Sequence, residues 1–188
     1  MGIKYKVLMV LMVVALTMTS VLFGCNNERQ LVIPSSLSPY EVVEEIFPEN
    51  PWRFIIGESL DISNLPKGAC KEGFVGGYSE PFFDGRPINQ TKYLILVFEV
   101  LKYESPEFAK RSYDSIGEAY ELHNLTYRNI ALKAGVEPLS EQGENITGVS
   151  NASWYVIHSG HFVICSIGHD DTARDAVNRT IDTFGVEK

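Results

Sequence analysis

The sequence lacks the short motifs by which many enzymes and metal proteins are identified. It contains no Cys-x-x-Cys, no His-Glu-x-x-His, no Walker loop and no dinucleotide fingerprint. Basic side chains are also few, since 16 Lys and Arg stand against 24 Asp and Glu, for a net charge of −8. This acidic balance argues against nucleic acid as a partner. With 45% hydrophobic and 21% charged residues, the composition is that of a globular domain and excludes collagen-like, coiled-coil and wholly disordered chains.

Charged residues are absent from residues 7–24, which follow a short start carrying Lys4 and Lys6. A basic start followed by an apolar stretch is typical of an export signal. The stretch ends at residues 22–25, of sequence LFGC, which resembles the lipobox of prokaryotic lipoproteins. The resemblance implies cleavage before Cys25 and a diacylglyceryl lipid on its sulfur. An uncleaved membrane anchor is the alternative.

The lipobox resemblance predicts the organisation of the whole chain. We expect a signal peptide over residues 1–24, a lipidated Cys25 followed by a polar tether to residue 38, and one domain over residues 39–188. The lipid would hold the protein on the cell membrane, facing the extracytoplasmic side. Cleavage removes Lys4 and Lys6, so the mature chain carries 16 − 2 = 14 basic and 24 acidic side chains, a net charge of −10.

Two cysteines remain once Cys25 carries a lipid. In an oxidising compartment, Cys70 and Cys165 are expected to form a disulfide. Because the closed loop is long, chain entropy predicts a stabilisation of about 4 kcal/mol. The alternative is a pair of buried free thiols that behave as small hydrophobic side chains.

Acceptor triplets for N-linked glycans form a second signal of export. The sequence contains five Asn-x-Ser/Thr triplets without proline at the middle position. Together with a lipobox, these triplets indicate an archaeal cell envelope and predict a glycoprotein. The five asparagines are Asn89, Asn124, Asn145, Asn151 and Asn178.

The hydrophobic pattern predicts an α+β fold. Helices are expected from Ser38, from Ser105 to about residue 122, and from Asp170 or Asp171, each beginning at a capping residue. A strand over residues 93–101 is apolar on both faces, which indicates a central position in a sheet. Segments 154–158 and 161–167 flank a turn at residues 159–160 and predict a hairpin. We therefore expect an antiparallel sheet with helices packed on one face, built from two strand–strand–helix units.

The order of these elements resembles the small extracellular sensor domains of some bacterial serine/threonine kinases and free lipoproteins. The shared features are the helix from Ser105, the hairpin at Trp154 with Cys165 in its second strand, and the closing helix from Asp171. They cover about half of the mature chain. The resemblance implies a domain that binds a ligand, and it names no chemistry.

Candidate reactive residues are few. His158 and His161 would face each other across the hairpin, but no third metal ligand lies near them in the sequence, so we expect no metal site and no cofactor. Gly57-Glu58-Ser59-Leu60 resembles the nucleophile block of GDSL-type esterases, with Glu58 where that family has Asp. The chain lacks the Asp-x-x-His that those enzymes need.

These observations favour a non-catalytic domain that binds a small ligand or a protein of the cell envelope. Two alternatives stay open at this point. One is a serine hydrolase that uses Ser59 with a histidine brought near it by the fold. The other is a structural surface protein coated with glycans.

Overall fold

The computed structural model describes residues 29–48, 57–84, 93–120, 126–127, 131–137 and 152–187. The chain divides into two compact units, residues 1–29 with 187–188 and residues 30–186. The larger unit holds the described elements apart from Arg29 and Glu187, the outermost residues of the first and last strands. No described helix is long and apolar enough to cross a membrane.

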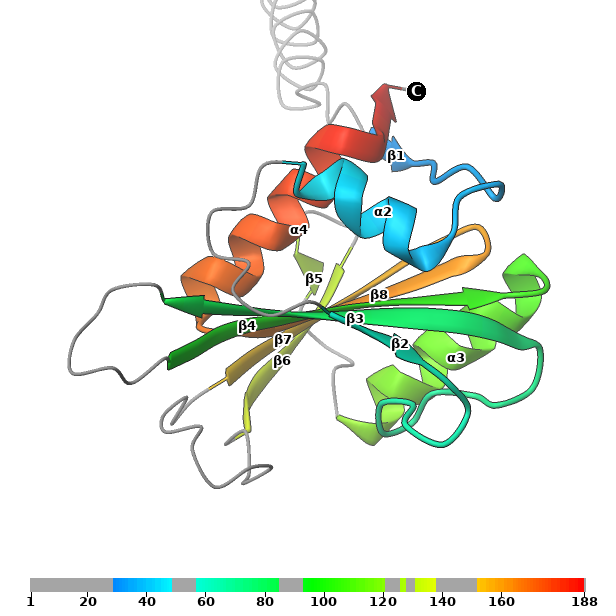
Figure 1. The fold of residues 1–188 in the computed structure, drawn as a ribbon, viewed down its shortest axis with the longest axis horizontal. Helices are drawn as coiled ribbons and strands as arrows, with labels where there is room; N and C mark the ends of the chain where they lie inside the picture. The colour runs from blue at the N-terminus through cyan, green and yellow to red at the C-terminus, as the bar shows by residue number, and fades with distance from the viewer. Residues whose placement is uncertain are drawn as a thin grey trace, which may run out of the picture. The chain divides into compact units, whose positions relative to one another are not determined.

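An antiparallel sheet organises the larger unit, in the order β2-β3-β4-β8-β7-β6-β5 (Figure 1). Each strand pairs with its neighbours in antiparallel register, which confirms the predicted α+β class and the antiparallel sheet. The strands are β2 (Glu58–Leu60), β3 (Phe74–Asp84), β4 (Tyr93–Tyr103), β5 (Thr126–Tyr127), β6 (Ala131–Glu137), β7 (Ala152–Ser159) and β8 (Phe162–Gly168).

Two of the three predicted helix starts are confirmed by their caps. Helix α2 (Pro39–Ile46) begins after Ser38, whose side chain accepts the N–H of Glu41 while Glu41 accepts the N–H of Ser38 in return. Helix α3 (Pro106–Ala119) begins after Ser105, whose hydroxyl accepts the N–H of Phe108. In both helices a proline occupies the first turn, where its missing N–H costs nothing.

The last helix, α4 (Asp170–Phe184), starts differently. Its N-cap is His169, which makes no side-chain capping bond, so neither Asp170 nor Asp171 caps the helix as predicted. The carboxylate of Asp170 instead accepts hydrogen bonds from the hydroxyls of Ser153 at 2.8 Å and Tyr155 at 2.9 Å. These bonds attach the start of α4 to β7.

The helices lie on both faces of the sheet, and the prediction of one covered face is wrong. Helices α2 and α4 lie above the sheet in Figure 1 and α3 lies below it. The physical reason lies in the two central strands. Every residue of β8 is buried, and β4 has buried side chains on both of its faces, such as Phe98 on one and Leu101 on the other. A strand that is apolar on both sides needs cover on both sides.

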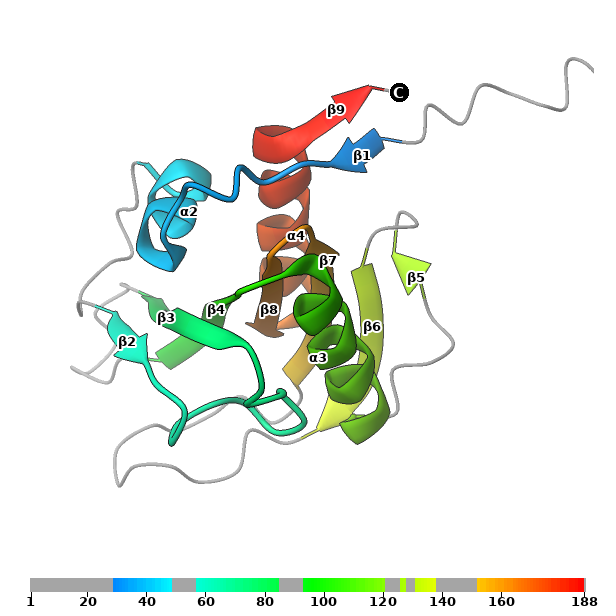
Figure 2. The same ribbon diagram turned by 90° about the vertical axis from the view of Figure 1, so that its right-hand side faces the viewer.

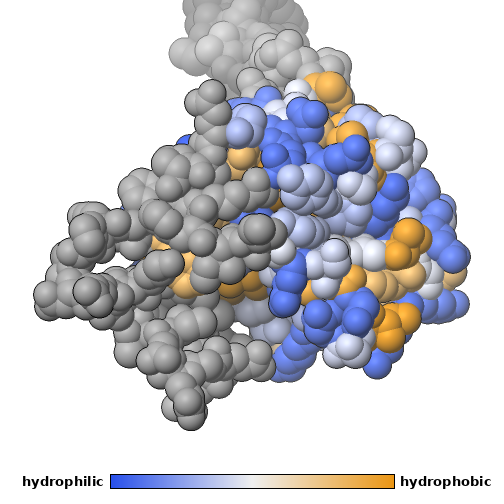
Figure 3. Space-filling view, viewed as in Figure 1, coloured by the Kyte–Doolittle hydropathy of each residue, from blue (hydrophilic) through white to orange (hydrophobic). Residues whose placement is uncertain are grey.

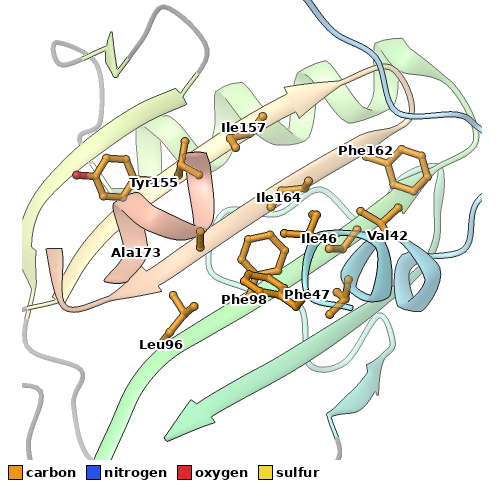
Figure 4. Close-up of a cluster of buried hydrophobic side chains, with 14 of the residues drawn as sticks. Val42, Ile46, Phe47, Leu96, Phe98, Tyr155, Ile157, Phe162, Ile164 and Ala173 are labelled. Carbon is orange, nitrogen blue, oxygen red and sulfur yellow. The ribbon is translucent and has the colours of Figure 1, made fainter. Parts of the chain in front are cut away.

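Each face has its own core. Above the sheet, Phe98 of β4 and Ile164 of β8 pack against α2 and α4, with Ile46, Phe47 and Ala173 closing over them (Figure 4). The core beneath the sheet joins α3 to the same strands and contains buried residues Leu60, Leu101, Tyr103, Ala109, Ile116, Trp154, Val156, Val163, Cys165 and Ile167.

The chain order repeats as predicted, with β3-β4-α3 followed by β7-β8-α4. The two hairpins adjoin through β4 and β8. Because α3 and α4 pack on opposite faces, the two units are not equivalent in space.

Residues 30–38, at the start of the larger unit, are part of the fold. Strand β1 (Arg29–Leu31) pairs with β9 (Gly185–Glu187), beside the end of α4 (Figure 2). Ile33 is buried in the upper core, and its N–H donates to the Ser159 hydroxyl at 3.2 Å, which itself donates to the carbonyl of Leu31 at 2.9 Å. Residues 30–38, predicted to be part of a polar tether, therefore belong to the compact unit, because Ile33 is buried in the upper core and Leu31 and Leu37 pack against it.

We predict that Ser159→Ala lowers the free energy of unfolding by about 1–3 kcal/mol, because it leaves the buried N–H of Ile33 and the carbonyl of Leu31 without their partner. Urea unfolding of the mature domain measures the loss. Ser59→Ala, at an exposed position of β2, is the matched control and should change stability little. Equal stability of the Ser159 variant and the wild type would contradict the role given to this hydroxyl.

Candidate functional site

The described surface on the side shown in Figure 3 is mainly hydrophilic, with hydrophobic residues in separate places. Large exposed hydrophobic side chains occur singly along the chain, as Val32, Tyr40, Ile62, Val75 and Val186. Single exposed hydrophobic residues are normal for a soluble surface. A small ligand is expected in a concave place with an apolar lining and a few polar groups.

One such place is a hollow of about 110 Å³ between the end of α2, strands β3 and β4, and the first turns of α4. Its floor is apolar, and its two charged residues both come from α4. The lining residues are Phe47, Phe82, Ile95, Leu96, Thr172, Asp175, Ala176 and Arg179. The labelled Phe47 and Leu96 lie in the layer between the helices and the sheet in Figure 4.

Local sequence explains how these residues meet. Helix α2 ends at Ile46, two residues before Pro48, and its C-cap residue Phe47 turns onto the sheet, where its ring packs 4.8 Å from that of Phe82. On α4, the spacing of Thr172, Asp175, Ala176 and Arg179 at three and four residues places all four on one side of the helix.

The rim of the hollow carries an ion pair. Nε of Arg179 donates to the Asp175 carboxylate at 2.8 Å, and the two side chains are 54% and 60% exposed. The guanidinium of Arg179 also lies over the Phe47 ring, 5.9 Å from its centre. An ion pair this exposed contributes at most about 1 kcal/mol, so either charge is available to a ligand at little cost.

The sequence alone does not indicate this site, because Asp175 and Arg179 belong to no catalytic or ligand-binding motif. A single Arg–Asp pair spaced by four residues is common on exposed helices and does not indicate a site. Only the packing of α2 against β3 beside this pair creates the hollow.

The cysteines differ from their prediction, because Cys70 and Cys165 are both free in the structure and no disulfide joins them. Both cysteines pack in the core below the sheet, near Tyr103, and both contribute to the raised pKa of its hydroxyl. The Tyr103 hydroxyl lies 2.7 Å from the Ser112 hydroxyl and donates a hydrogen bond to the Cys70 carbonyl at 3.2 Å. Burial raises the pKa of the Cys165 thiol well above its usual value and that of Tyr103 to about 12. The thiols therefore pack as small hydrophobic groups, the alternative left open by the sequence.

The two hairpin histidines are not partners across the strands. The pairing of Ser159 with Phe162 shifts the turn by one residue, to Gly160 and His161, so His158 faces Val163 instead. Gly160 has φ +54°, a value that glycine adopts without strain. Nδ1 of His161 lies 3.0 Å from the Tyr103 carbonyl, and burial lowers the pKa of His158. Among the described residues, no group of three His, Cys, Asp or Glu side chains could hold a metal ion.

Ser59 lies on the edge strand β2, where it is exposed and pairs with Tyr78. Tyr78 belongs to the core of the α2 face, whereas His158 contacts Tyr113 of α3 on the other face. Three strands also separate β2 from β7, the strand of His158, a distance of about 19 Å. The structure does not bring Ser59 together with His158. His123 lies outside the described residues.

The modification sites are mostly outside the described residues, which include neither Cys25 nor Asn89, Asn124, Asn145 and Asn151. Asn178 is half-buried within α4, and Thr180 of the same triplet is fully buried, with its hydroxyl donating to the Ala176 carbonyl. This triplet therefore lies in a helix, not in the surface loop that an acceptor triplet predicts.

Comparison with known proteins adds little. No protein-family model and no curated protein matches the sequence. Among solved structures, the extracellular domain of PknH from Mycobacterium tuberculosis is similar, with a TM-score of 0.36 and 8% sequence identity over 81% of this chain and 96% of that chain. A likeness this weak carries no argument about function.

We predict that mass spectrometry of unfolded, unreduced protein finds Cys70 and Cys165 each able to take a maleimide label. In the folded protein, Cys165 should resist labelling, because it is fully buried and its raised pKa keeps the thiol protonated. Reduced protein labelled after unfolding is the positive control. A chain that takes no label at these positions until it is reduced would contradict free thiols and restore the disulfide.

Proposed function

We propose that this protein is a lipid-anchored extracytoplasmic domain that binds a small apolar carboxylate, or a carboxylate-bearing apolar group of a larger partner, in the hollow between α2 and α4. The observation that carries the proposal is the combination of an apolar floor with Arg179 on the rim. Phe47, Phe82 and Leu96 would contact the apolar part of the ligand, and the guanidinium would bind its carboxylate.

The choice of an anion follows from the geometry of the rim. Arg179 is held over Phe47, beside the floor, whereas its present partner Asp175 is 60% exposed. A ligand carboxylate would replace Asp175 on the guanidinium and bury its own apolar part at the same time. Burial of that apolar part supplies the free energy that an exposed ion pair alone does not.

The size of the hollow limits the ligand. A volume of about 110 Å³ is the room of roughly three to four water molecules. It accepts a branched alkyl group or one small ring, and it is too small for a ligand of drug size. A side chain beside a free carboxyl group, or the end of a short branched acid, has the right dimensions.

We also infer that the domain has no catalytic role of its own. The separation of Ser59 from His158 by face and by strand supports this view against the serine hydrolase. A serine nucleophile needs a base within hydrogen-bond reach. Among the described residues that line the hollow there is no serine, cysteine or histidine.

The lipid anchor is supported by the sequence around Cys25 and by the place where the compact unit begins. That unit starts at Gln30, so four residues lie between it and Cys25, and the five Cα–Cα steps from Cys25 to Gln30 span at most about 17 Å. A lipid on Cys25 would thus hold the domain close to the bilayer.

Binding to the hollow is tested with isovalerate, a branched acid, and its neutral amide isovaleramide. We expect isovalerate to shift the backbone NMR signals of α4 residues around Ala176, and isovaleramide to bind at least several-fold more weakly, because it offers Arg179 no charge. Arg179→Gln should remove the preference for the acid. Thr172→Leu, which enlarges a half-buried lining residue, should weaken both ligands.

Arg111→Gln is the matched control for Arg179→Gln. Arg111 is also exposed, pairs with Glu72 at 3.0 Å and lies 4.6 Å from the centre of the Phe108 ring, but it lies on α3 and outside the hollow. Its loss should leave isovalerate binding unchanged. The proposed site is wrong if isovalerate shifts no signals of α4, or if the Arg111 and Arg179 variants lose binding equally.

For the lipid anchor, we expect Cys25→Ser to prevent the addition of the lipid and to release the protein from the membrane fraction or leave it unprocessed. Expression in a host with a lipoprotein pathway, followed by fractionation and intact mass measurement, provides the readout. Cys70→Ser is the control, because Cys70 lies within the domain. Normal processing and membrane fractionation of the Cys25 variant would exclude the anchor and leave the hollow unaffected.

A further inference from the structure

The two ends of the larger unit pair with each other in a short antiparallel ribbon. Strands β1 and β9 run side by side in opposite directions (Figure 2), and the N–H of Val32 donates to the carbonyl of Phe184 at 3.0 Å. In an antiparallel ladder, residues joined by such a bond are direct partners, so two residues further out Gln30 stands opposite Val186. We call residues 30–32 and 184–186 the terminal ribbon.

The terminal ribbon has one face toward the core and one face toward solvent. On its first strand, Leu31 packs against the upper core, whereas Gln30 and Val32 on either side of it are exposed. Val186, the partner of Gln30, is also exposed. Side chains two residues apart, and direct partners in adjacent strands, project to the same face. Gln30, Val32 and Val186 therefore share one outward face.

This outward face is uncharged in a chain that is acidic as a whole. Val32 and Val186 are 48% and 47% exposed, and the polar residue between them is an amide. Residues 30–40 and 183–186 contain no charged side chain, although the chain carries a net charge of −8. Acidic surfaces are repelled by anionic lipid headgroups. An uncharged apolar face is thus the part of this domain best suited to contact with a bilayer.

The length of chain before the terminal ribbon indicates what this face meets. The larger unit begins at Gln30, and the five Cα–Cα steps back to Cys25 span at most about 17 Å. A lipid on Cys25 would keep the outward face within that distance of the membrane. So short a tether gives a high effective concentration, at which even the contact of two valine side chains is populated.

We propose that the outward face of the terminal ribbon rests on the lipid bilayer, with Val32 and Val186 at the boundary between headgroups and acyl chains. The proposal rests on the lipid anchor at Cys25, which brings the ribbon to the membrane. The valine methyl groups leave water for an apolar surrounding, and the Gln30 amide stays among the polar headgroups.

This contact would set the direction in which the hollow opens. Helix α4 ends at Phe184 in the terminal ribbon, whereas the hollow is lined by residues of its first turns, beginning at Thr172. At about 1.5 Å per residue, Thr172 lies roughly 18 Å along the helix from Phe184. The helix would stand with its last turn toward the bilayer and hold the hollow away from the lipid, open to ligands from the extracytoplasmic side.

The test attaches the mature chain to a bilayer through Cys25, whether or not a cell adds the lipid. A Cys70→Ser chain is coupled to a maleimide lipid in nanodiscs, and the fully buried Cys165 does not react. Lipids with a nitroxide headgroup then broaden the NMR signals that lie near the membrane. We expect the methyl signals of Val32 and Val186 to broaden at least roughly fivefold more than those of Val75, which is 58% exposed on β3. Broadening should also decrease along α4 from its end toward its start.

Variants show whether the valines make the contact. Val32→Ser combined with Val186→Ser should lower the broadening of the ribbon backbone signals at least roughly threefold, because it removes the apolar contact at two exposed positions. Val75→Ser is the matched control and should change nothing. Raising the salt concentration from about 50 mM to about 500 mM should leave the broadening unchanged, because uncharged residues make the contact.

Three results would overturn the proposal. Equal broadening of Val32, Val186 and Val75 would mean that the domain moves freely on its tether. Unchanged broadening in the double variant would mean that another surface makes the contact. Ribbon signals that shift with the concentration of uncoupled protein would assign the face to a second copy of the chain. Because the lipid is supplied chemically, these results are independent of the Cys25→Ser experiment, and isovalerate binding reports separately on the hollow.

Discussion

Every residue of β8 is buried, and this single condition shapes the rest of the unit. Its side chains alternate between two faces, so water must be excluded from both. Strand β4 pairs with the whole of β8 and shares the requirement, with Phe98 and Val100 facing one core and Leu101 and Tyr103 the other. The sheet is therefore covered by helices on both faces, by α2 and α4 on one and by α3 on the other. The segment that follows β1 extends the cover above, because Ile33 enters the core of the α2 face and the N–H of Val32 donates to the carbonyl of Phe184 at the end of α4.

This two-sided construction places the candidate site on one face of the sheet. On the α2 face, the hollow presents the cation of Arg179 beside an apolar floor. The sheet lies between the hollow and α3, so a ligand in the hollow does not contact the core that contains Cys165.

Much of the local structure could be predicted because its causes lie close together in the sequence. Ser38 and Ser105 start helices through bonds to residues three positions away. The apolar run of β4 required a central place in a sheet wherever its partners came from. Predictions that needed a register or a partner were less accurate. The hairpin turn shifted by one residue, which moved His158 away from His161, and Asp170 bonded to β7 when a cap had been expected.

The hollow could not be found from the sequence, for a physical reason. Arg179 and Phe47 are separated by more than 130 residues and meet because α2 and α4 pack on the same face of the sheet. Their meeting depends on strand order, which places β8 beside β4 and not beside β3. Hydrophobic periodicity indicates which side of an element is buried, but it does not indicate against what.

The sequence by itself determined the class of the fold, two helix starts, the central strand and the resemblance to an export signal before Cys25. Each of these depends on residues that are close together in the chain. The tertiary structure alone decided which face each helix covers, where the domain begins and which polar groups are buried together. Those properties depend on contacts between segments that are distant in the sequence and meet only in the two cores.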